Sequence, residues 1–211
     1  MPVRGTRRPA DAAAAVARVE RLWLAALQRL AAGVGHEMRN ALNGVAVNLE
    51  VVRSRAARDG TPATSLAQYA SSASDQLESV ITIAEALVAL NRAPQRPVVA
   101  GRLADQLLAL IRPQLVAVGG SARLVVEGEG KSNVSAEAAR LVLAGALEAG
   151  ATAAAEHRCE LLCIVRPSGG IEVEIKAGPG PLSPGEEIRR IARENGIDVR
   201  VNDGIILSFP K

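Results

Sequence analysis

The first part of the chain carries apolar residues at alternating steps of three and four, the spacing of one face of an α-helix. From Asp11 to Arg58 there is no proline, and the pattern predicts one long helix. Its apolar positions are Leu27, Ala31, Val34, Met38, Ala41, Val45, Leu49 and Val52. Such a helix rises about 1.5 Å per residue, so it is too long for one small domain to cover its apolar face. We therefore expect it to pack against other helices.

A second long helix is expected from Thr64 to Asn91, after a turn at Asp59-Gly60-Thr61-Pro62. Its apolar face is Leu66, Ala70, Ala73, Leu77, Val80, Ala84 and Leu87. Two long helices joined by a short loop form an antiparallel helical hairpin, and each keeps apolar surface that its partner cannot cover. We therefore expect two chains to pair into a dimeric four-helix bundle.

The chain beyond this hairpin has a different pattern. Helices are expected at 103–115, 136–155 and 186–195, and strands at 122–127, 160–165, 171–176, 197–201 and 204–209. Helices that are grouped separately from the strands of an antiparallel-rich sheet indicate an α+β domain, in which helices and sheet pack together as an α/β sandwich. The expected organisation is a disordered basic arm (1–10), the helical hairpin (11–92), a proline-containing linker (93–97) and this smaller α+β domain (98–211).

The composition argues against nucleic-acid and membrane partners. The chain is rich in alanine, its net charge is only +3, and its aromatic residues are Trp23, Tyr69 and Phe209. Single-stranded nucleic acids need aromatic platforms, and duplexes need a clustered basic face. No apolar run reaches the roughly 18 residues of a membrane span, and the N-terminus has no secretory signal pattern. We therefore expect a cytoplasmic protein.

The two cysteines, Cys159 and Cys163, lie four residues apart in an apolar stretch. Together with His157 they would give zinc three ligands and no fourth. We expect buried, reduced thiols and no metal site.

A polar stripe interrupts the first helix. His36, Arg39, Asn40 and Asn43 fall on the side away from the apolar face, and Glu37 follows His36 directly. An exposed imidazole beside a carboxylate can act as a nucleophile. Read without further context, the same residues are an ordinary solvated surface, and they lack the second histidine of a zinc-protease helix.

The segment Gly35-His36-Glu37-Met38-Arg39-Asn40-Ala41-Leu42-Asn43 resembles the H-box of two-component histidine kinases, which lies on the first helix of a dimerising hairpin. The resemblance implies that His36 accepts a phosphoryl group and that Glu37 is its acid/base partner. It also implies that Asn40 orients water when a response regulator is dephosphorylated. Arg39 and Asn43 would line the docking face for a receiver domain. Ala41 stands where the family commonly has proline, so we expect a straighter helix.

The second half resembles the ATP-binding domain of the same kinases, with key residues replaced. Leu141 and Gly145 stand where that family has magnesium-coordinating asparagines, and neither side chain offers an oxygen. Ala177-Gly178-Pro179-Gly180 resembles the glycine box, but Lys176 replaces the aspartate that accepts a hydrogen bond from adenine. After Pro181 the lid and the second glycine-rich loop are missing. We expect no cofactor, neither ATP nor magnesium.

The combination resembles the bacterial histidine phosphotransferases of phosphorelays. We predict a homodimer that moves phosphoryl groups between receiver-domain aspartates through a phosphohistidine, without using ATP. Three alternatives remain open. One is an ATP-dependent histidine kinase with divergent motifs, and another is a response-regulator phosphatase acting through Glu37 and Asn40. The third is a non-catalytic dimeric scaffold that sequesters receivers.

Overall fold

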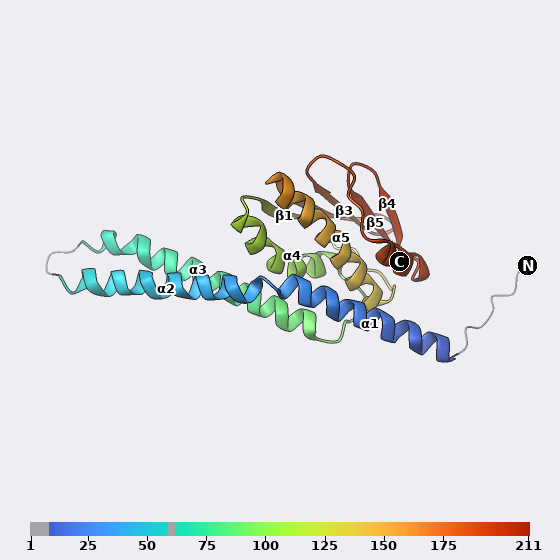
Figure 1. Cartoon of the computed structure of the whole chain (residues 1–211), viewed down its shortest axis with the longest axis horizontal. Helices are drawn as coiled ribbons and strands as arrows, with labels where there is room; N and C mark the ends of the chain where they lie inside the picture. The colour runs from blue at the N-terminus through green and yellow to red at the C-terminus, as the bar shows by residue number, and fades with distance from the viewer. Residues whose placement is uncertain (1–8, 59–61) are drawn as a thin grey trace, which may run out of the picture.

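The computed structural model describes residues 9–58 and 62–211 (Figure 1). Its helices are α1 (Pro9–Ala31), α2 (Val34–Ala56), α3 (Thr64–Asn91), α4 (Ala100–Ala117), α5 (Ala136–His157) and α6 (Glu186–Glu194). Its strands are β1 (Ser121–Val126), β2 (Glu160–Pro167), β3 (Gly170–Ala177), β4 (Asp198–Val201) and β5 (Ile205–Pro210). Most of the expected arm and of the expected turn between the first two helices lie outside the described residues.

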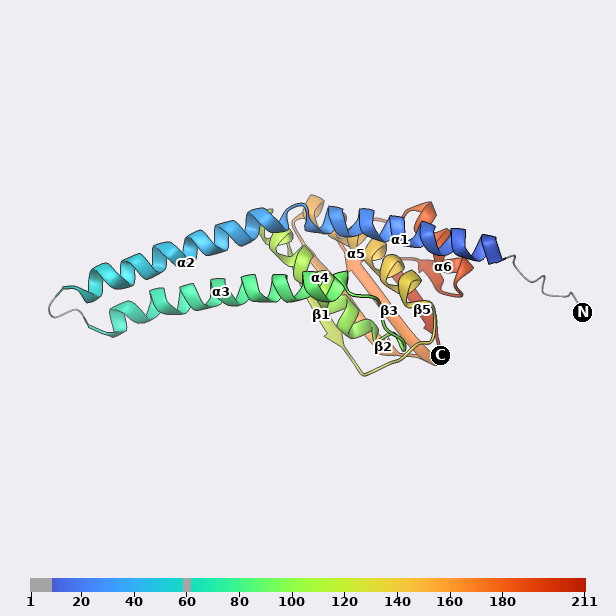
Figure 2. The same cartoon turned by 90° about the horizontal axis from the view of Figure 1, so that it is seen from below.

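Helices α2 and α3 form an antiparallel hairpin that projects from the rest of the molecule (Figures 1 and 2). α3 has the bounds that the sequence predicts. Polar side chains meet inside the hairpin, where the Asn48 amide donates to Ser72 Oγ at 3.2 Å and to Gln76 Oε1 at 3.3 Å. Gly44 leaves the space for Gln76, because a Cβ at this glycine would lie 2.6 Å from Gln76 Oε1.

The predicted apolar face of the hairpin is correct only in part. On α3 the buried residues are Ala73, Ile83, Ala86 and Leu90, and only Ala73 belongs to the predicted set. Leu49 and Leu77, which were expected inside, are 54% and 45% exposed. The reason is that polar residues occupy part of the contact between α2 and α3. The hairpin thus has two apolar faces, one between its helices and one turned outward.

The single helix expected at 11–58 is wrong, because it is interrupted at Ala32 and Gly33. In a continuous helix the Leu30 carbonyl would accept from the Val34 N–H. Here the Gln114 amide of α4 donates to Leu30 O at 2.8 Å instead. Gly33 makes the approach possible, since a Cβ there would lie 3.2 Å from the Gln114 side chain. α1 also starts at Pro9, inside the expected arm, and α2 continues unbroken through Ala41.

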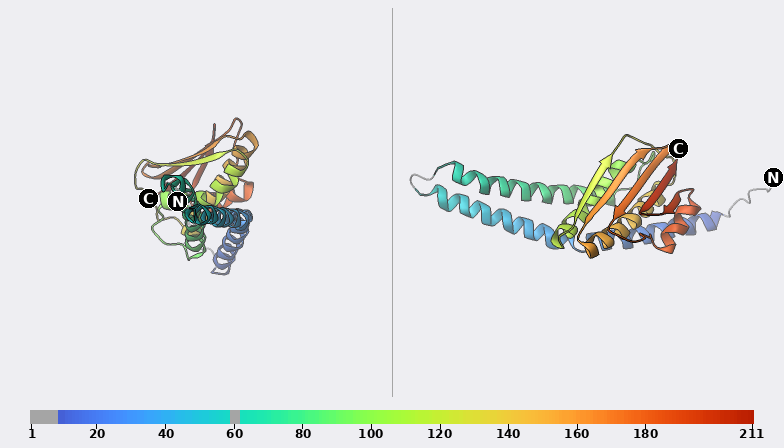
Figure 3. Two further views of the ribbon diagram at one scale, coloured as in Figure 1. Left: turned by 90° about the vertical axis from the view of Figure 1, so that its left-hand side faces the viewer. Right: turned by 90° about the horizontal axis from the view of Figure 1, so that it is seen from above.

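The C-terminal part is a five-stranded mixed sheet with the order β1-β2-β3-β5-β4. β1 pairs with β2 in parallel, and the other pairs are antiparallel. Figure 3 shows the sheet on the outside, with α4 and α5 against one of its faces. Alternate strand residues, such as Cys163, Val173 and Leu207, are completely buried on that face. The expected helices and strands of this part are all present, and none of their bounds is shifted by more than three residues.

Helix α5 is the central helix of this domain. Among the described residues it is the one helix long and apolar enough to cross a membrane by length and composition, which corrects the expectation that none is. However, 61% of its apolar window is buried inside the protein. It packs against α1, α4, α6 and the sheet. Its apolar character therefore serves the core of the domain.

Helix α1 packs along α5 and joins the two halves of the molecule (Figure 2). Arg18 Nε donates to Glu187 Oε1 of α6 at 2.7 Å, and Arg29 forms an ion pair with Glu148 at 3.0 Å. The Arg140 guanidinium of α5 lies 4.5 Å from the ring centroid of Trp23, which is itself buried. The helix that leads to His36 is therefore attached to the C-terminal domain.

Candidate functional site

His36 lies in the first turn of α2, directly after the interruption at Gly33. The N–H groups of His36 and Glu37 both donate to Gly33 O at 3.2 Å, which starts the helix. The His36 side chain is exposed, and no hydrogen bond or ion pair from the described residues engages it. His36 is the third residue of α2 and so lies at its N-terminal end, where the dipole of this helix favours negative charge.

The other residues of the predicted stripe share this face. Arg39, Asn40 and Asn43 follow His36 at intervals of three, four and seven, and all are exposed. Arg39 Nε donates to Gly35 O at 3.1 Å, which holds its guanidinium close to the first turn. The structure therefore brings four of the five predicted residues together on one solvent-facing strip of α2.

Glu37 lies on the flank of the helix and is half-buried. Adjacent residues on a helix point about 100° apart, so they do not face each other. Within the described part of the chain, the Glu37 carboxylate has no hydrogen bond to the His36 ring. Glu37 is therefore next to His36 in the sequence, but its carboxylate does not orient the imidazole in this structure.

The hairpin also has an exposed apolar strip. It consists of Leu42 and Leu49 on α2 and of Leu77, Ile81 and Val88 on α3. These residues are 45% to 55% exposed, although they lie on two well-formed helices. The hairpin thus presents an apolar surface in addition to the His36 strip.

In the C-terminal domain, the two positions compared with magnesium-binding asparagines are part of the core. Leu141 is 1% exposed. Gly145 lies beneath Ile188 of α6, and a Cβ at this glycine would be 2.8 Å from Ile188 Cγ1. The α6 side chain therefore fills the space beside α5 that a larger residue at Gly145 would need.

The glycine segment after β3 is a tight turn. Gly178 and Gly180 have φ values of +60° and +110°, which side chains rarely adopt. The His157 ring packs against Gly178, because a Cβ there would lie 2.6 Å from His157 Cδ2. Lys176 is exposed and pairs with Glu174 at 2.6 Å. Strand alternation places Lys176 on the same face of β3 as half-buried Glu172 and Glu174, opposite to buried Ile175.

The cysteines are free thiols, as expected from the sequence. Cys163 is completely buried, and burial raises the pKa of its thiol to about 12. Cys159 is half-buried. Among the described residues, no three His, Cys, Asp or Glu side chains come together as a possible metal site.

Sequence reasoning missed the residues that shape the surroundings of the site. The Gln114 side chain of α4 donates to Leu30 O at the end of α1, a few residues before His36, and Ile188 covers Gly145. Trp23 and Arg140 attach α1 to α5. The glycine at position 33 within an alanine-rich helix was the one signal that could have indicated the interruption, because glycine is unfavourable in a helix interior.

No family model matches the chain, and no curated protein sequence matches it. Among solved structures it is similar to the histidine kinase AdeS of Acinetobacter baumannii, with a TM-score of 0.40 and 15% sequence identity. The similarity covers 83% of this chain and 98% of that one.

Proposed function

We propose that the chain is a histidine phosphotransferase that carries phosphoryl groups between receiver-domain aspartates on His36. The observation that carries the proposal is an exposed histidine in the first turn of α2, followed by Arg39, Asn40 and Asn43 on the same face. This strip offers a nucleophile, a cation and two amides to an incoming phosphoryl group, and none of them is occupied by another side chain of the described residues.

The transfer step follows from this chemistry. An imidazole nitrogen of His36 attacks the phosphorus of an aspartyl phosphate, and a P–N bond forms as the P–O bond to the aspartate breaks. The carboxylate leaves with the bonding electron pair, and the ring loses its N–H proton to Glu37 or to water. A second receiver aspartate then attacks the same phosphorus and takes the group from the ring, which regains a proton.

The surroundings of His36 suit the charge that this step brings. The phosphoryl group would lie over the first turn of α2, where the dipole and the free N–H groups stabilise an anion. The Arg39 guanidinium is held at the same turn by its bond to Gly35 O. Asn40, one turn further, is positioned to orient the group or a water molecule. Positioning of this kind supplies most of the catalysis in phosphoryl transfer.

We further propose that the protein binds neither ATP nor magnesium, so that the phosphoryl group comes from a receiver. Support comes from the close packing of Ile188 on Gly145 and from the turn that His157 covers at Gly178. Lys176 forms an ion pair with Glu174. Each of the compared positions thus has a packing or pairing role within the domain.

The working form is proposed to be a cytoplasmic homodimer. The exposed apolar strip of the hairpin supports it, because such surfaces on two long helices are usually covered by a partner. His36, Asn40 and Asn43 lie more than about 90° around α2 from Leu42 and Leu49, so in the proposed dimer the polar strip stays open to receiver domains.

Transfer from a phosphorylated receiver domain tests the proposal directly. The wild type is incubated with receiver domains carrying radioactive aspartyl phosphate, and acid-labile label on the chain is measured. We expect label on the wild type and none on the His36→Ala variant. Absence of label on the wild type with a panel of receivers, or equal label on the variant, contradicts the proposal.

The chain offers a matched control, since it has two histidines. His157→Ala removes the other one, at the end of α5, and should be labelled like the wild type. The Asn40→Ala variant separates the phosphatase alternative. If the protein acts only as a phosphatase, receiver dephosphorylation survives His36→Ala and is lost in Asn40→Ala.

A further inference from the structure

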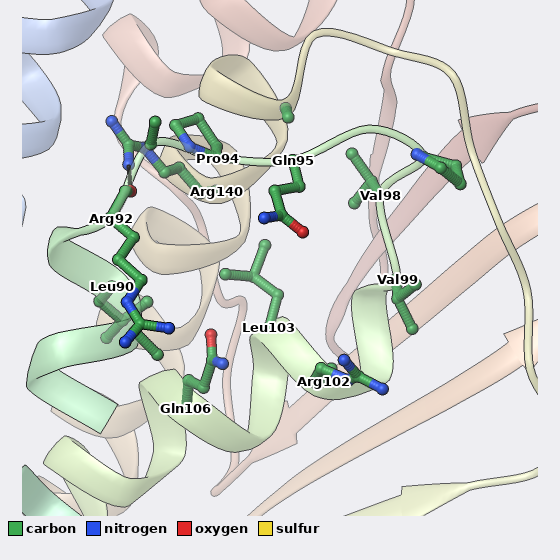
Figure 4. A pocket seen from close by; sticks show the side chains of 14 residues that line it. Leu90, Arg92, Pro94, Gln95, Val98, Val99, Arg102, Leu103, Gln106 and Arg140 are labelled. Atoms are coloured by element: carbon green, nitrogen blue, oxygen red, sulfur yellow. Dashed lines mark hydrogen bonds between the residues drawn. The ribbon is translucent and has the colours of Figure 1, made fainter. Parts of the chain in front are cut away.

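A cavity between the hairpin and the C-terminal domain has a lining that is not explained by phosphoryl transfer. It measures about 290 Å³ and lies where the end of α3, the linker, the start of α4 and the start of α5 meet (Figure 4). Its lining includes Arg92 at the end of α3, Gln95 of the linker, Arg102, Leu103 and Gln106 of α4, and Arg140 of α5. Its volume is at the lower end of the range for small-molecule sites.

The charge of this lining is of one sign. Three arginines line the cavity, Arg92 from the end of α3, Arg102 from α4 and Arg140 from α5, and none of its lining residues is acidic. Arg92 and Arg102 are exposed, and neither guanidinium forms an ion pair with a described residue. Uncompensated arginines from separate elements create a local positive potential that attracts anions.

Arg140 is already engaged in part. One of its terminal nitrogens donates to Arg92 O at 3.3 Å, its guanidinium lies over Trp23, and its Nε is buried without a hydrogen-bond partner. Burial lowers the pKa of Arg140, while the nearby charges of Glu137 and Glu20 act in the opposite direction and partly offset its positive charge. An anion in the cavity would reduce the desolvation cost of this group. The two free charges, on Arg92 and Arg102, match a dianion better than a monoanion.

The rest of the lining has the character of a binding site for an organic group. Figure 4 shows Gln95 from the linker and Gln106 from α4 directed into the same space, with Leu103 between them. Val98 is buried and Pro94 half-buried in the opposite wall. Two amides in an apolar wall can orient a small molecule by hydrogen bonds while its body is removed from water. α4 also starts here with no side-chain cap on its first N–H groups.

We propose that this cavity binds a small organic phosphate monoester. Arg92 and Arg102 hold the dianionic phosphate, and the Gln95 and Gln106 amides and Leu103 contact the organic body. Arginine is suited to this because its planar guanidinium donates two parallel hydrogen bonds to phosphate oxygens. The proposal rests on the cavity alone, and it does not depend on phosphoryl transfer at His36.

An occupant of the cavity would have a consequence for the whole molecule. The cavity wall contains the last turn of α3 and the linker that leads from the hairpin to α4. A bound phosphate ester would connect Arg92 on the hairpin side with Arg102 on the domain side. It would thereby stiffen the junction between the two parts.

Calorimetric titration with phenyl phosphate, a stable monoester with a dianionic phosphate and a compact ring, tests this site. The titration uses the full chain at low ionic strength, because exposed arginines are strongly screened by salt. We expect saturable binding that weakens by about tenfold or more in the Arg92→Ala/Arg102→Ala variant, which loses the charged hydrogen bonds. Benzoate, with the same ring and a single charge, should bind more weakly, and so should inorganic phosphate.

The control is Arg123→Ala, which removes an arginine paired with Glu160 on the sheet. It should bind phenyl phosphate like the wild type, and circular dichroism verifies that both variants are folded. His36→Ala should also bind normally, which separates this site from the phosphotransfer site. The proposal is overturned by absence of saturable binding, by equal affinity of the double variant and the wild type, or by benzoate binding as tightly as phenyl phosphate.

Discussion

Gly145 and Ile188 fit together so closely that the packing of the C-terminal domain can be tested at this one position. A Cβ at Gly145 would lie 2.8 Å from Ile188 Cγ1, well inside van der Waals contact. We expect Gly145→Asn, which introduces the residue type that a nucleotide site would need, to lower the free energy of unfolding by about 1–3 kcal/mol through overpacking. Urea denaturation followed by circular dichroism measures the change.

A second substitution makes the cause specific. In the Ile188→Ala background the space beside Gly145 is open, so Gly145→Asn should cost clearly less stability there than in the wild type. Equal costs in both backgrounds would contradict the packing explanation. Neither variant is expected to gain ATP binding, because Leu141 and Lys176 are unchanged.

Cys163 gives the domain a pH dependence whose sign follows from burial. Burial raises the pKa of its thiol from the ordinary value of 9.0 to about 12 in the folded protein. The neutral thiol is therefore favoured by folding, and this contribution to stability is complete below 9.0 and is lost as the pH rises toward about 12. We expect the wild type to lose stability more steeply in this window than Cys163→Ala.

The measurement is urea denaturation at a series of alkaline pH values, read as the difference between the two proteins. Taking the difference removes the titration of arginines, lysines and Cys159, which both proteins share. Identical pH slopes would show that the thiol is not desolvated as the structure has it. At neutral pH the variant has only the constant cost of a small cavity.

Single residues also show what could be read from the sequence. The polar strip at His36, Arg39, Asn40 and Asn43 was predictable, because helical periodicity alone places these residues on one exposed face. The position of Ile188 against Gly145 was not, since α6 is about forty residues away in the chain. Local periodicity determines which side of a helix faces solvent, and only the tertiary fold determines what covers the other side.

At the level of elements, the interruption between α1 and α2 depends on Gln114. Its amide occupies Leu30 O, the acceptor that the Val34 N–H would use in a continuous helix. We expect Gln114→Ala to free this carbonyl, so that the α-helical bond to Val34 forms. Hydrogen exchange of the Val34 and Gly35 amides, measured by NMR, should then become slower than in the wild type.

Gln106→Ala is the matched control, because this residue lies two turns earlier on the same helix and does not contact Leu30 O. Its exchange at Val34 should be like that of the wild type. If Gln114→Ala leaves the exchange at Val34 unchanged or makes it faster, Gln114 is not what holds the interruption. Loss of its bonds to Leu30 O and Leu110 O should also cost about 1–2 kcal/mol of stability.

The elements themselves were largely predictable, and the interruption was the exception. The second hairpin helix, the strands and α5 follow from periodicity, proline positions and turn residues. The break at Gly33 did not, because alanine and leucine on both sides favour a helix and the competing donor, Gln114, comes from a distant element. The exposure of Leu49 and Leu77 was not predictable either, because it too depends on a contact between elements. Gly44 of α2 leaves space for the Gln76 side chain of α3 inside the hairpin.

On the scale of the whole molecule, His36 lies at the junction of two bodies. α1 is attached to the C-terminal domain through Arg18, Trp23 and Arg29, whereas α2 belongs to the projecting hairpin. The histidine follows the two residues that separate these helices. In the proposed phosphotransfer complex, a receiver at His36 would therefore contact both the hairpin and the C-terminal domain. The angle between α1 and α2 at Gly33 would determine how these two surfaces are oriented toward the receiver.

The outward apolar face of the hairpin leads to the last prediction, on assembly. Leu49, Leu77 and Ile81 are half exposed on two stable helices, which in water favours association with a second copy. We expect sedimentation analysis to give about twice the chain mass of 21.9 kDa for the wild type. The Leu77→Glu/Ile81→Glu variant should sediment as a monomer, because pairing would bury the two carboxylates without partners. Val116→Glu, at a more exposed position on α4, outside the hairpin, should remain dimeric. A wild type that sediments as a monomer at micromolar concentration, or dimers that survive the double substitution, would exclude this face as the interface.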